Sequence, residues 1–144
     1  MSDPERRWFE YRHRVTFGDT NAAGNVYFAK HFAWQGECRE RLLAQHYPDF
    51  INDLRQGFTL TTEFAHQEFF AEAALFDLLL IRLTVIGLTR SRMELEFEFV
   101  REQDGTLLSR GRQAVIWTNP QRRASLMPDQ LYETTAAYFG IGEP

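Results

Sequence analysis

The sequence has little cysteine, little lysine and no long apolar run, and each shortage excludes a class of protein. Cys38 is the single cysteine among 144 residues, so a disulfide within the chain is impossible and a reducing compartment is expected. Lys30 is the single lysine beside fifteen arginines, a bias that we attribute mainly to codon usage, although arginine also suits forked recognition of carboxylate or phosphate. No apolar run is long enough for a signal peptide or a membrane span. We therefore expect a soluble, cytoplasmic protein without a membrane partner.

Charge and residue spacing exclude two further classes. The formal net charge is −4, which gives no electrostatic reason to expect a nucleic-acid partner. His13 and His66 have no partners at a recognisable metal-ligand spacing, and Cys38 lies in a predicted helix without the setting of a reactive thiol. We predict no metal, no cofactor and a buried, inert Cys38.

The chain is long enough for one core, and that core is rich in aromatic residues. Hydrophobic residues make up 44% and aromatic residues 15%, with 13 Phe. This composition favours a sheet-rich core or an aromatic-lined pocket. We predict a single domain over residues 1–144.

A turn-rich loop leads into a long apolar helix, and the rest of the chain is organised around this stretch. The loop contains the turn-forming residues Asn21, Gly24 and Asn25. Asn25 is the predicted N-cap of a helix over 26–46. We expect this helix to be buried on most sides. A helix start exposes unpaired N–H groups and the positive end of the helix dipole. We expect the N–H groups of Gly24, Asn25 and Val26 to polarise a carbonyl or hold an anion.

Alternation of apolar and polar residues, together with Thr, Phe and β-branched content, predicts five strands, although the Leu-rich first half of 75–88 would also suit a helix. Asp104-Gly105 is a hairpin signal between the last two strands, and a short helix is expected over 128–139. The fold class is α+β, with one curved antiparallel sheet wrapped around one long central helix. One face and one edge of such a sheet remain exposed, so a second copy is expected to cover them. The predicted strands cover 9–17, 58–70, 75–88, 92–100 and 106–117.

Arg39 is the charged side chain of the helix that most needs an explanation. An arginine in an apolar element is costly unless it is paired or faces a cavity. From the residues alone we favour a salt bridge with Glu37, Glu40 or a sheet glutamate. Because Arg41 lies alongside, at least one of the two arginines is expected to be structural.

Residues 17–41 resemble a known family. The pattern FGDTNAAGNVYF, followed by WQGECRE in a chain of five predicted strands, is similar to the hotdog-fold thioesterases of the 4-hydroxybenzoyl-CoA thioesterase type. Within that superfamily, the NxxGNVY and WQGxCRE segments are similar to the enediyne-biosynthesis polyketide thioesterases. The resemblance covers essentially the whole chain and implies a hotdog fold.

Asn21 departs from the common thioesterases, and His31 departs from the enediyne subgroup. Their loop ends in a catalytic carboxylate, whereas this chain has Asn21, and an amide is neither a base nor a useful nucleophile. The enediyne subgroup uses an Asn and a helix Arg instead, which correspond to Asn21 and Arg39. His31 stands where the subgroup has Tyr, so it either donates a hydrogen bond, acts as the missing base, or is simply buried. Asp19 is expected to fix the loop.

The resemblance implies release of a polyketide or polyene β-ketoacyl chain from an acyl carrier protein, with loss of CO2 to a methyl ketone, in enediyne antibiotic biosynthesis. Asn21 and Arg39 would hold the oxyanion and a water, with His31 beside them. Partners would be the carrier protein and further copies of the chain, as a dimer or a dimer of dimers with sites at the subunit interface. The candidate substrate-binding residues are Tyr27, Phe58, Thr62 and Glu37.

Two alternatives remain open at this point. One is a general acyl-CoA thioesterase that uses Glu37 or Glu68 as its carboxylate. The other is a non-catalytic hotdog protein that binds acyl chains, because losing the usual carboxylate is also how such a fold would lose activity. A hotdog dehydratase is disfavoured because no strand histidine is placed with an acid at the helix start.

Overall fold

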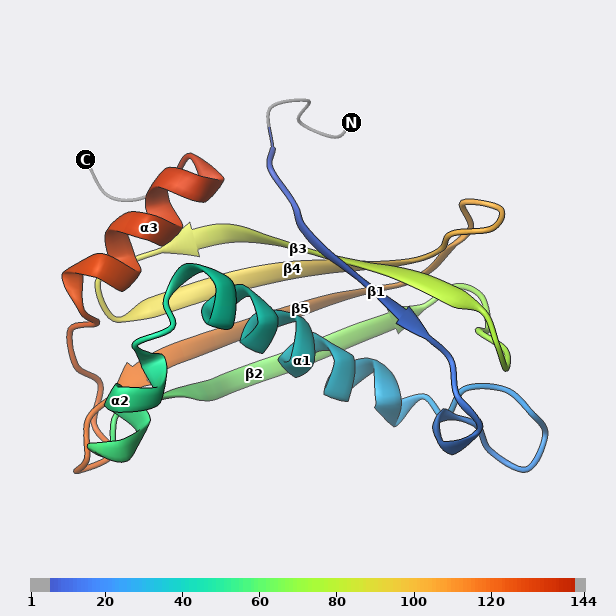
Figure 1. Cartoon of the computed structure of the whole chain (residues 1–144), viewed down its shortest axis with the longest axis horizontal. Helices are drawn as coiled ribbons and strands as arrows, with labels where there is room; N and C mark the ends of the chain where they lie inside the picture. The colour runs from blue at the N-terminus through green and yellow to red at the C-terminus, as the bar shows by residue number, and fades with distance from the viewer. Residues whose placement is uncertain (1–5, 142–144) are drawn as a thin grey trace.

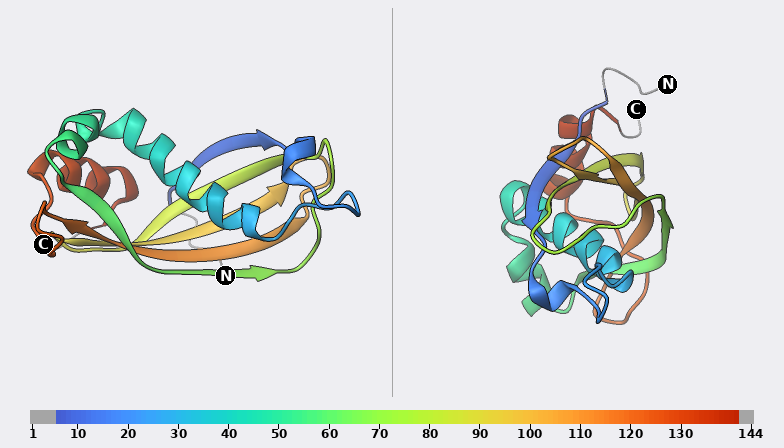
Figure 2. Two further views of the ribbon diagram at one scale, coloured as in Figure 1. Left: turned by 90° about the horizontal axis from the view of Figure 1, so that it is seen from below. Right: turned by 90° about the vertical axis from the view of Figure 1, so that its right-hand side faces the viewer.

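A curved sheet of five antiparallel strands holds one long helix in its concave face, as the sequence predicted (Figure 1). The computed structural model describes residues 6–141. Viewed from one end, the sheet wraps around the helix, and viewed from below the helix crosses the sheet diagonally (Figure 2). The elements are β1 (Phe9–Arg14), η1 (Phe17–Asp19), α1 (Ala29–His46), α2 (Phe50–Arg55), β2 (Thr59–Phe69), β3 (Leu78–Leu88), β4 (Arg92–Arg101), β5 (Leu107–Thr118) and α3 (Asp129–Phe139).

The strand order β1-β3-β4-β5-β2 leaves β1 and β2 as the two edges. The predicted hairpin between β4 and β5 is confirmed, and Gly105 has the positive φ of 72° that the turn requires. A bulge lies in β2 between Thr62 and Phe64. It resets the alternation, so that Thr62, Ala65 and Phe69 all face the concave side.

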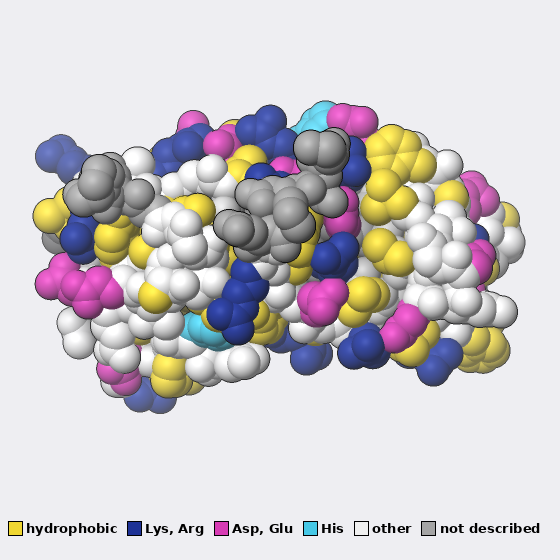
Figure 3. All heavy atoms as spheres, turned by 90° about the horizontal axis from the view of Figure 1, so that it is seen from above, with side chains coloured by type: hydrophobic (Ala, Val, Ile, Leu, Met, Phe, Trp, Pro, Cys, Tyr) yellow, Lys and Arg dark blue, Asp and Glu magenta, His cyan; other side chains and the backbone are white. Residues whose placement is uncertain are grey.

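The core lies between α1 and the concave face of the sheet. On β4 the predicted alternation is confirmed, because its apolar side chains are buried and its glutamates lie on the outer side. That outer side carries cross-strand ion pairs such as Arg82–Glu98 at 3.1 Å and Arg112–Glu94 at 2.6 Å. Figure 3 shows basic and acidic side chains next to one another along one side of the molecule. The most deeply buried core residues include Leu79, Ile81, Leu83, Leu95, Phe97, Phe99, Val115 and Trp117.

The predicted start of α1 is wrong by three residues. The helix begins at Ala29 rather than Val26, its N-cap position is Phe28, and no side chain caps it. The cause is a contact distant in sequence: Val26 N–H donates to the Ala73 carbonyl at 3.0 Å, which holds residues 25–26 extended against residues 73–74. The predicted end at His46 is confirmed.

The expectation that α1 is buried on most sides is also wrong for the single chain. One side of the helix faces the sheet, and Cys38 is fully buried there, as predicted. On the other side Phe32 and Ala33 are exposed, and a Cβ placed on Gly36 would meet nothing within 4 Å. The outward side of α1 is therefore available for a contact with another molecule.

Two short helices close the end of the sheet opposite the loop. The expected helical turn in the 49–57 connector is α2. The predicted terminal helix is α3, which follows Pro128 and ends at Gly140 with a left-handed φ of 67°. Within residues 6–141, no helix combines the length and apolar character needed to cross a bilayer.

Candidate active site

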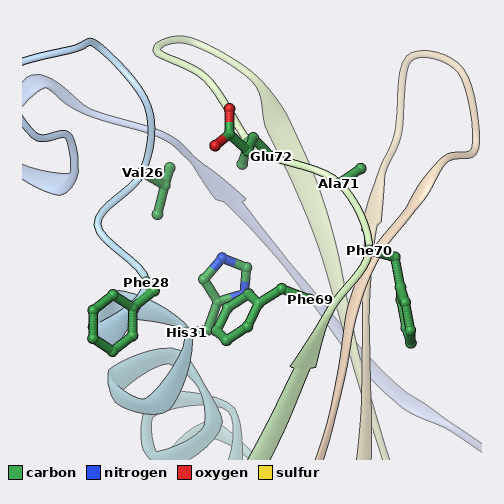
Figure 4. A pocket seen from close by; sticks show the side chains of 8 residues that line it. Val26, Phe28, His31, Phe69, Phe70, Ala71 and Glu72 are labelled. Atoms are coloured by element: carbon green, nitrogen blue, oxygen red, sulfur yellow. The ribbon is translucent and has the colours of Figure 1, made fainter.

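A pocket of about 360 Å³ opens where α1 begins. Figure 4 shows its walls: the first turn of α1 on one side, the end of β2 and the segment that follows it on the other. Phe28 and Phe69 give it aromatic walls, and Glu72 is the carboxylate among the residues that line it. The lining residues are Val26, Phe28, His31, Phe69, Phe70, Ala71, Glu72 and Ala73.

His31 lies at the base of this pocket and is 3% exposed. Its Nδ1 lies 2.7 Å from the Ser109 hydroxyl on β5, and the rings of Trp34, Phe69 and Phe99 surround it at centroid distances of 5.2, 4.9 and 5.3 Å. Burial lowers the pKa of His31 to about 4. The imidazole is therefore neutral at neutral pH.

Behind His31, glutamine side chains join the helix to the sheet. Gln67 Nε2 donates to Ser109 Oγ at 2.9 Å, and Gln35 Nε2 donates to Gln67 Oε1 at 2.5 Å and to the His66 carbonyl at 3.0 Å. These groups fit under α1 because residue 111 of β5 is glycine, where a Cβ would collide with both amides. A buried polar row thus runs from the pocket along the underside of the helix.

The Arg39 side chain also lies between α1 and the sheet, and it does not form a surface ion pair. Its Nη1 donates to Gln113 Oε1 on β5 at 2.6 Å, its Nε is buried without a partner among the described residues, and burial lowers its pKa. The salt bridge predicted from the residues alone is therefore wrong for Arg39. Arg41 is the structural arginine: it lies 3.2 Å from Glu37 and over the ring of Tyr11.

Arg39 and His31 do not share one pocket. They are eight residues apart on α1, which is about 12 Å along the helix axis. Arg39 lines a closed hollow of about 10 Å³ with Leu42, Leu60 and Leu95, away from the helix start. In a single chain, Arg39 therefore does not reach a group bound beside His31.

Asn21 lies in a third hollow, of about 420 Å³, on the exposed loop. Its Oδ1 accepts from the N–H of Ala23 at 3.0 Å, an Asx-type turn that shapes the loop. Two of the three expected N–H donors are used by the loop: Gly24 donates to Asn21 O, and Val26 donates to Ala73 O. The prediction of a helix start at residues 24–26 is corrected, and Phe28 and Ala29 carry the first-turn N–H groups that no described hydrogen bond uses.

Asp19 fixes the loop, as predicted. Its Oδ2 accepts from the backbone N–H of Thr16 at 2.9 Å and lies 2.8 Å from His13 Nε2. Burial alone would raise the pKa of Asp19, but the hydrogen bonds from Thr16 and the contact with His13 together lower it.

The remaining candidate residues lie outside the pocket of His31. Thr62 is exposed on the concave side of β2, and Tyr27 is exposed beside the ring of Phe28. Phe58 stacks on Trp117 at the opposite end of β2. Glu37 is held by Arg41, and Glu68 lies 3.3 Å from His66 on the surface.

Sequence reasoning missed the polar row and Glu72. A signal for the row was present, because Ser109, Gly111 and Gln113 occupy alternate positions of β5, in line with the apolar Val115 and Trp117. Nothing in the sequence pattern singled out Glu72, which lies in the interruption after β2. Within residues 6–141, no cluster of three His, Cys, Asp or Glu side chains could hold a metal ion.

A curved sheet around one helix, with a pocket at the helix start, defines a hotdog-fold protein. The sequence model of the thioesterase-like superfamily matches residues 15–134, and the chain belongs to that superfamily. It is a thioester hydrolase, as its named relatives are.

Three comparisons describe the similarity more closely. A 1,4-dihydroxy-2-naphthoyl-CoA hydrolase of Synechocystis is 30% identical over 122 residues, which cover 83% of this chain and 88% of that protein. The dynemicin thioesterase, whose crystal structures show polyene binding, superposes with a TM-score of 0.85 and 36% identity, covering 92% of this chain and 97% of that one. The structure of a 1,4-dihydroxy-2-naphthoyl-CoA thioesterase from Synechocystis superposes with a TM-score of 0.84 and 26% identity, covering 90% of this chain and 96% of that one. The resemblance to the enediyne thioesterases is supported.

Proposed function

We propose that the protein hydrolyses the thioester of a polyene β-ketoacyl chain held by an acyl carrier protein, and that the acid then loses CO2 to give a methyl ketone, in enediyne-type biosynthesis. The observation that carries this proposal is the aromatic pocket at the start of α1, together with 36% identity to the dynemicin thioesterase. The flat rings of Phe28 and Phe69 suit a conjugated chain.

The start of α1 provides the group that polarises the thioester. The carbonyl oxygen accepts hydrogen bonds from the N–H groups of Phe28 and Ala29, at the positive end of the helix dipole. A water oxygen adds to the carbonyl carbon. Collapse of the adduct breaks the C–S bond, and the departing thiolate takes up the proton that the water gave up.

Glu72 is the group in the pocket that can take the proton from water. Asn21 cannot do so because an amide is not a base, and burial opposes proton uptake by the His31 ring, whose pKa it lowers to about 4. Glu37 and Glu68 lie outside this pocket. A carboxylate after β2 thus replaces the one that the common thioesterases carry in the loop.

A second copy of the chain would bring Asn21 and Arg39 within reach of a shared site. In one chain these residues lie in separate hollows, so direct roles for them on the substrate require an assembly. The exposed edge of β2 and the outward side of α1 are the surfaces available for it. The homo-oligomer and the carrier protein remain the proposed partners.

The test uses a β-ketoacyl polyene on its carrier, with product release followed by mass spectrometry. Replacing Glu72 with Gln should lower kcat by about 100-fold or more, as loss of a general base does. The control is Glu68→Gln, an exposed carboxylate near the end of β2, which should keep the wild-type rate. Wild-type turnover by Glu72→Gln would remove Glu72 from the mechanism.

A second candidate substrate is an aromatic acyl-CoA. The relatives that are 30% identical hydrolyse 1,4-dihydroxy-2-naphthoyl-CoA, and a bicyclic aromatic acyl group also suits a pocket with phenylalanine walls. Turnover of aromatic acyl-CoA, with the carrier-bound polyene left intact, would favour this alternative over the first. The same Glu72→Gln variant tests both.

A further inference from the structure

Six polar side chains form one continuous row of hydrogen bonds beneath α1. The helix contributes a residue at every fourth position, about 6 Å apart along its axis. The sheet contributes Ser109 and Gln113 of β5, and Gln67 of β2, which pairs with Gly111, lies between them. The row ends at the pocket. Its members, from the far end to the pocket, are Arg39, Gln113, Gln35, Gln67, Ser109 and His31.

The far end of the row fixes the direction of the hydrogen bonds. A guanidinium has only donors, so the Gln113 atom that lies 2.6 Å from Arg39 is the acceptor Oε1. Gln113 Nε2 then faces Gln35 Oε1 at 3.4 Å. The orientation of Gln35 is set independently by the His66 carbonyl, which only accepts and lies 3.0 Å from Gln35 Nε2. Both anchors require the same amide orientation.

That direction continues to the hydroxyl of Ser109. Because Gln35 donates to Gln67, the Gln67 atom facing it is Oε1, and Gln67 Nε2 donates to Ser109 Oγ. A serine hydroxyl has one proton to donate. The remaining described partner of Ser109 Oγ is His31 Nδ1 at 2.7 Å. If Nδ1 carried a proton and donated it to Oγ, the buried hydroxyl proton would have no described acceptor, so the hydroxyl donates to Nδ1.

We infer that the row holds His31 as the tautomer with its proton on Nε2, so that His31 presents an N–H donor to the pocket and binds a carbonyl oxygen of the acyl substrate. Figure 4 shows one ring nitrogen of His31 directed into the pocket, toward the side where Glu72 lies. The inference deepens the proposed function and rests on it for the identity of the substrate. The substrate atom that His31 binds is an oxygen that accepts a hydrogen bond, either the thioester carbonyl oxygen or the β-keto oxygen.

This assignment separates the roles of the two candidate residues. His31 touches the substrate as a donor and is not the base, because Nδ1 is occupied by Ser109 and Nε2 already carries a proton. A low pKa keeps the ring neutral while it does so. Within one chain, Arg39 is a positioning residue that acts on His31 through the amides of Gln113, Gln35 and Gln67.

The first experiment reads the tautomer in the resting protein without substrate. With 15N-labelled histidine, the His31 signals are identified by their loss in His31→Gln. The result expected is a protonated Nε2 and an unprotonated Nδ1 at pH 7. A proton on Nδ1 would overturn the inference. Because no substrate is present, this result is independent of whether the carrier-bound polyene is hydrolysed.

The second experiment uses one near-isosteric change to reverse the direction of the hydrogen bonds between residue 67, Ser109 and His31. In Gln67→Glu, the carboxylate still accepts from Gln35 but must also accept from Ser109, which then takes its hydrogen bond from His31 Nδ1–H. The tautomer should switch, and kcat on whichever thioester is turned over should fall by about 100-fold, as for the loss of an oxyanion donor. The control Gln121→Glu makes the same change in an exposed loop.

The alternative outcomes of the second experiment are equally definite. An unchanged tautomer in Gln67→Glu, or a switched tautomer at the wild-type kcat, would each contradict the inference. His31→Phe should lose about as much activity as Gln67→Glu, whereas His31→Gln, which keeps an N–H donor, should recover part of it. Recovery by His31→Glu, which supplies an acceptor and a base, would count against the donor role.

Discussion

At the scale of single residues, burial decides the ionisation of His31. The rings of Trp34, Phe69 and Phe99 surround the imidazole, and Glu72 is the charged side chain that lines the same pocket. Removal from water disfavours the imidazolium and lowers the pKa to about 4, below the ordinary value of 6.5. Between these two values the unfolded chain binds a proton at His31 and the folded chain does not.

We therefore expect the free energy of unfolding to decrease as the pH is lowered, and we expect this decrease to depend on His31. The unfolded state binds more protons between pH 6.5 and 4, so the free energy of unfolding decreases as the pH falls. From pH 7 to pH 5 the loss should be about 2 kcal/mol. Urea unfolding of the wild type and of His31→Gln at both pH values measures it, because the other groups titrate alike in both proteins. An equal loss in the two would mean that His31 is charged in the folded state.

How well single residues could be predicted depends on the distance to their partners in the sequence. Asp19 was predicted to fix the loop, and its main partners, Thr16 and His13, lie three and six residues away. The partner of Arg39 is Gln113, 74 residues away, and no local pattern indicates which strand residue meets which helix residue. The nearby glutamates therefore looked like better partners than they are.

At the scale of elements, α1 can lie close to β5 because β5 has a glycine under the helix. Gly111 lies opposite Gln67 in the sheet and beneath Gln35 of the helix. The two amides occupy the space that a side chain at residue 111 would need. The packing of helix on strand and the polar row thus depend on the same residue.

Gly111→Ala should lower the free energy of unfolding by about 1–3 kcal/mol, as overpacking of a core does. The added methyl group also separates Gln35 from Gln67, so hydrolysis should fall as well. Gly36→Ala is the matched control, because it lies on the outward side of α1 where a Cβ meets nothing within 4 Å. Chemical denaturation of the three proteins makes the comparison, and equal losses in both variants would contradict a special role for Gly111.

Elements were predictable where their signal is local. Alternation and residue content gave the strands to within a few residues, and Gly140 marked the end of α3. The start of α1 was not predictable from Asn25, because the strand-like contact between residues 25–26 and 73–74 competes with helix formation there. A capping residue in the sequence cannot reveal such a contact.

At the scale of the whole molecule, an apolar strip remains uncovered between α1 and the edge strand β2. It consists of Phe28, Phe32, Ala65 and Phe69, all exposed although the last two face the concave side. The overall fold followed from the sequence because one sheet and one long apolar helix have few ways to bury each other. The apolar strip could not be predicted from the sequence, because the side of the helix that remains exposed to solvent depends on where the helix crosses the sheet.

A second copy that covers this strip would join the open edge of β2 to its counterpart and bury the exposed rings. Phe32→Glu places a charge at the centre of the strip and should dissociate the assembly, which sedimentation at several concentrations would show as a lower mass. Hydrolysis should fall in parallel if Asn21 or Arg39 reaches the substrate only across the interface. Leu126→Glu puts the same charge on an exposed leucine elsewhere and should change neither mass nor rate. An unchanged mass for a folded Phe32→Glu protein would show that the copies, if they associate, do so through another surface.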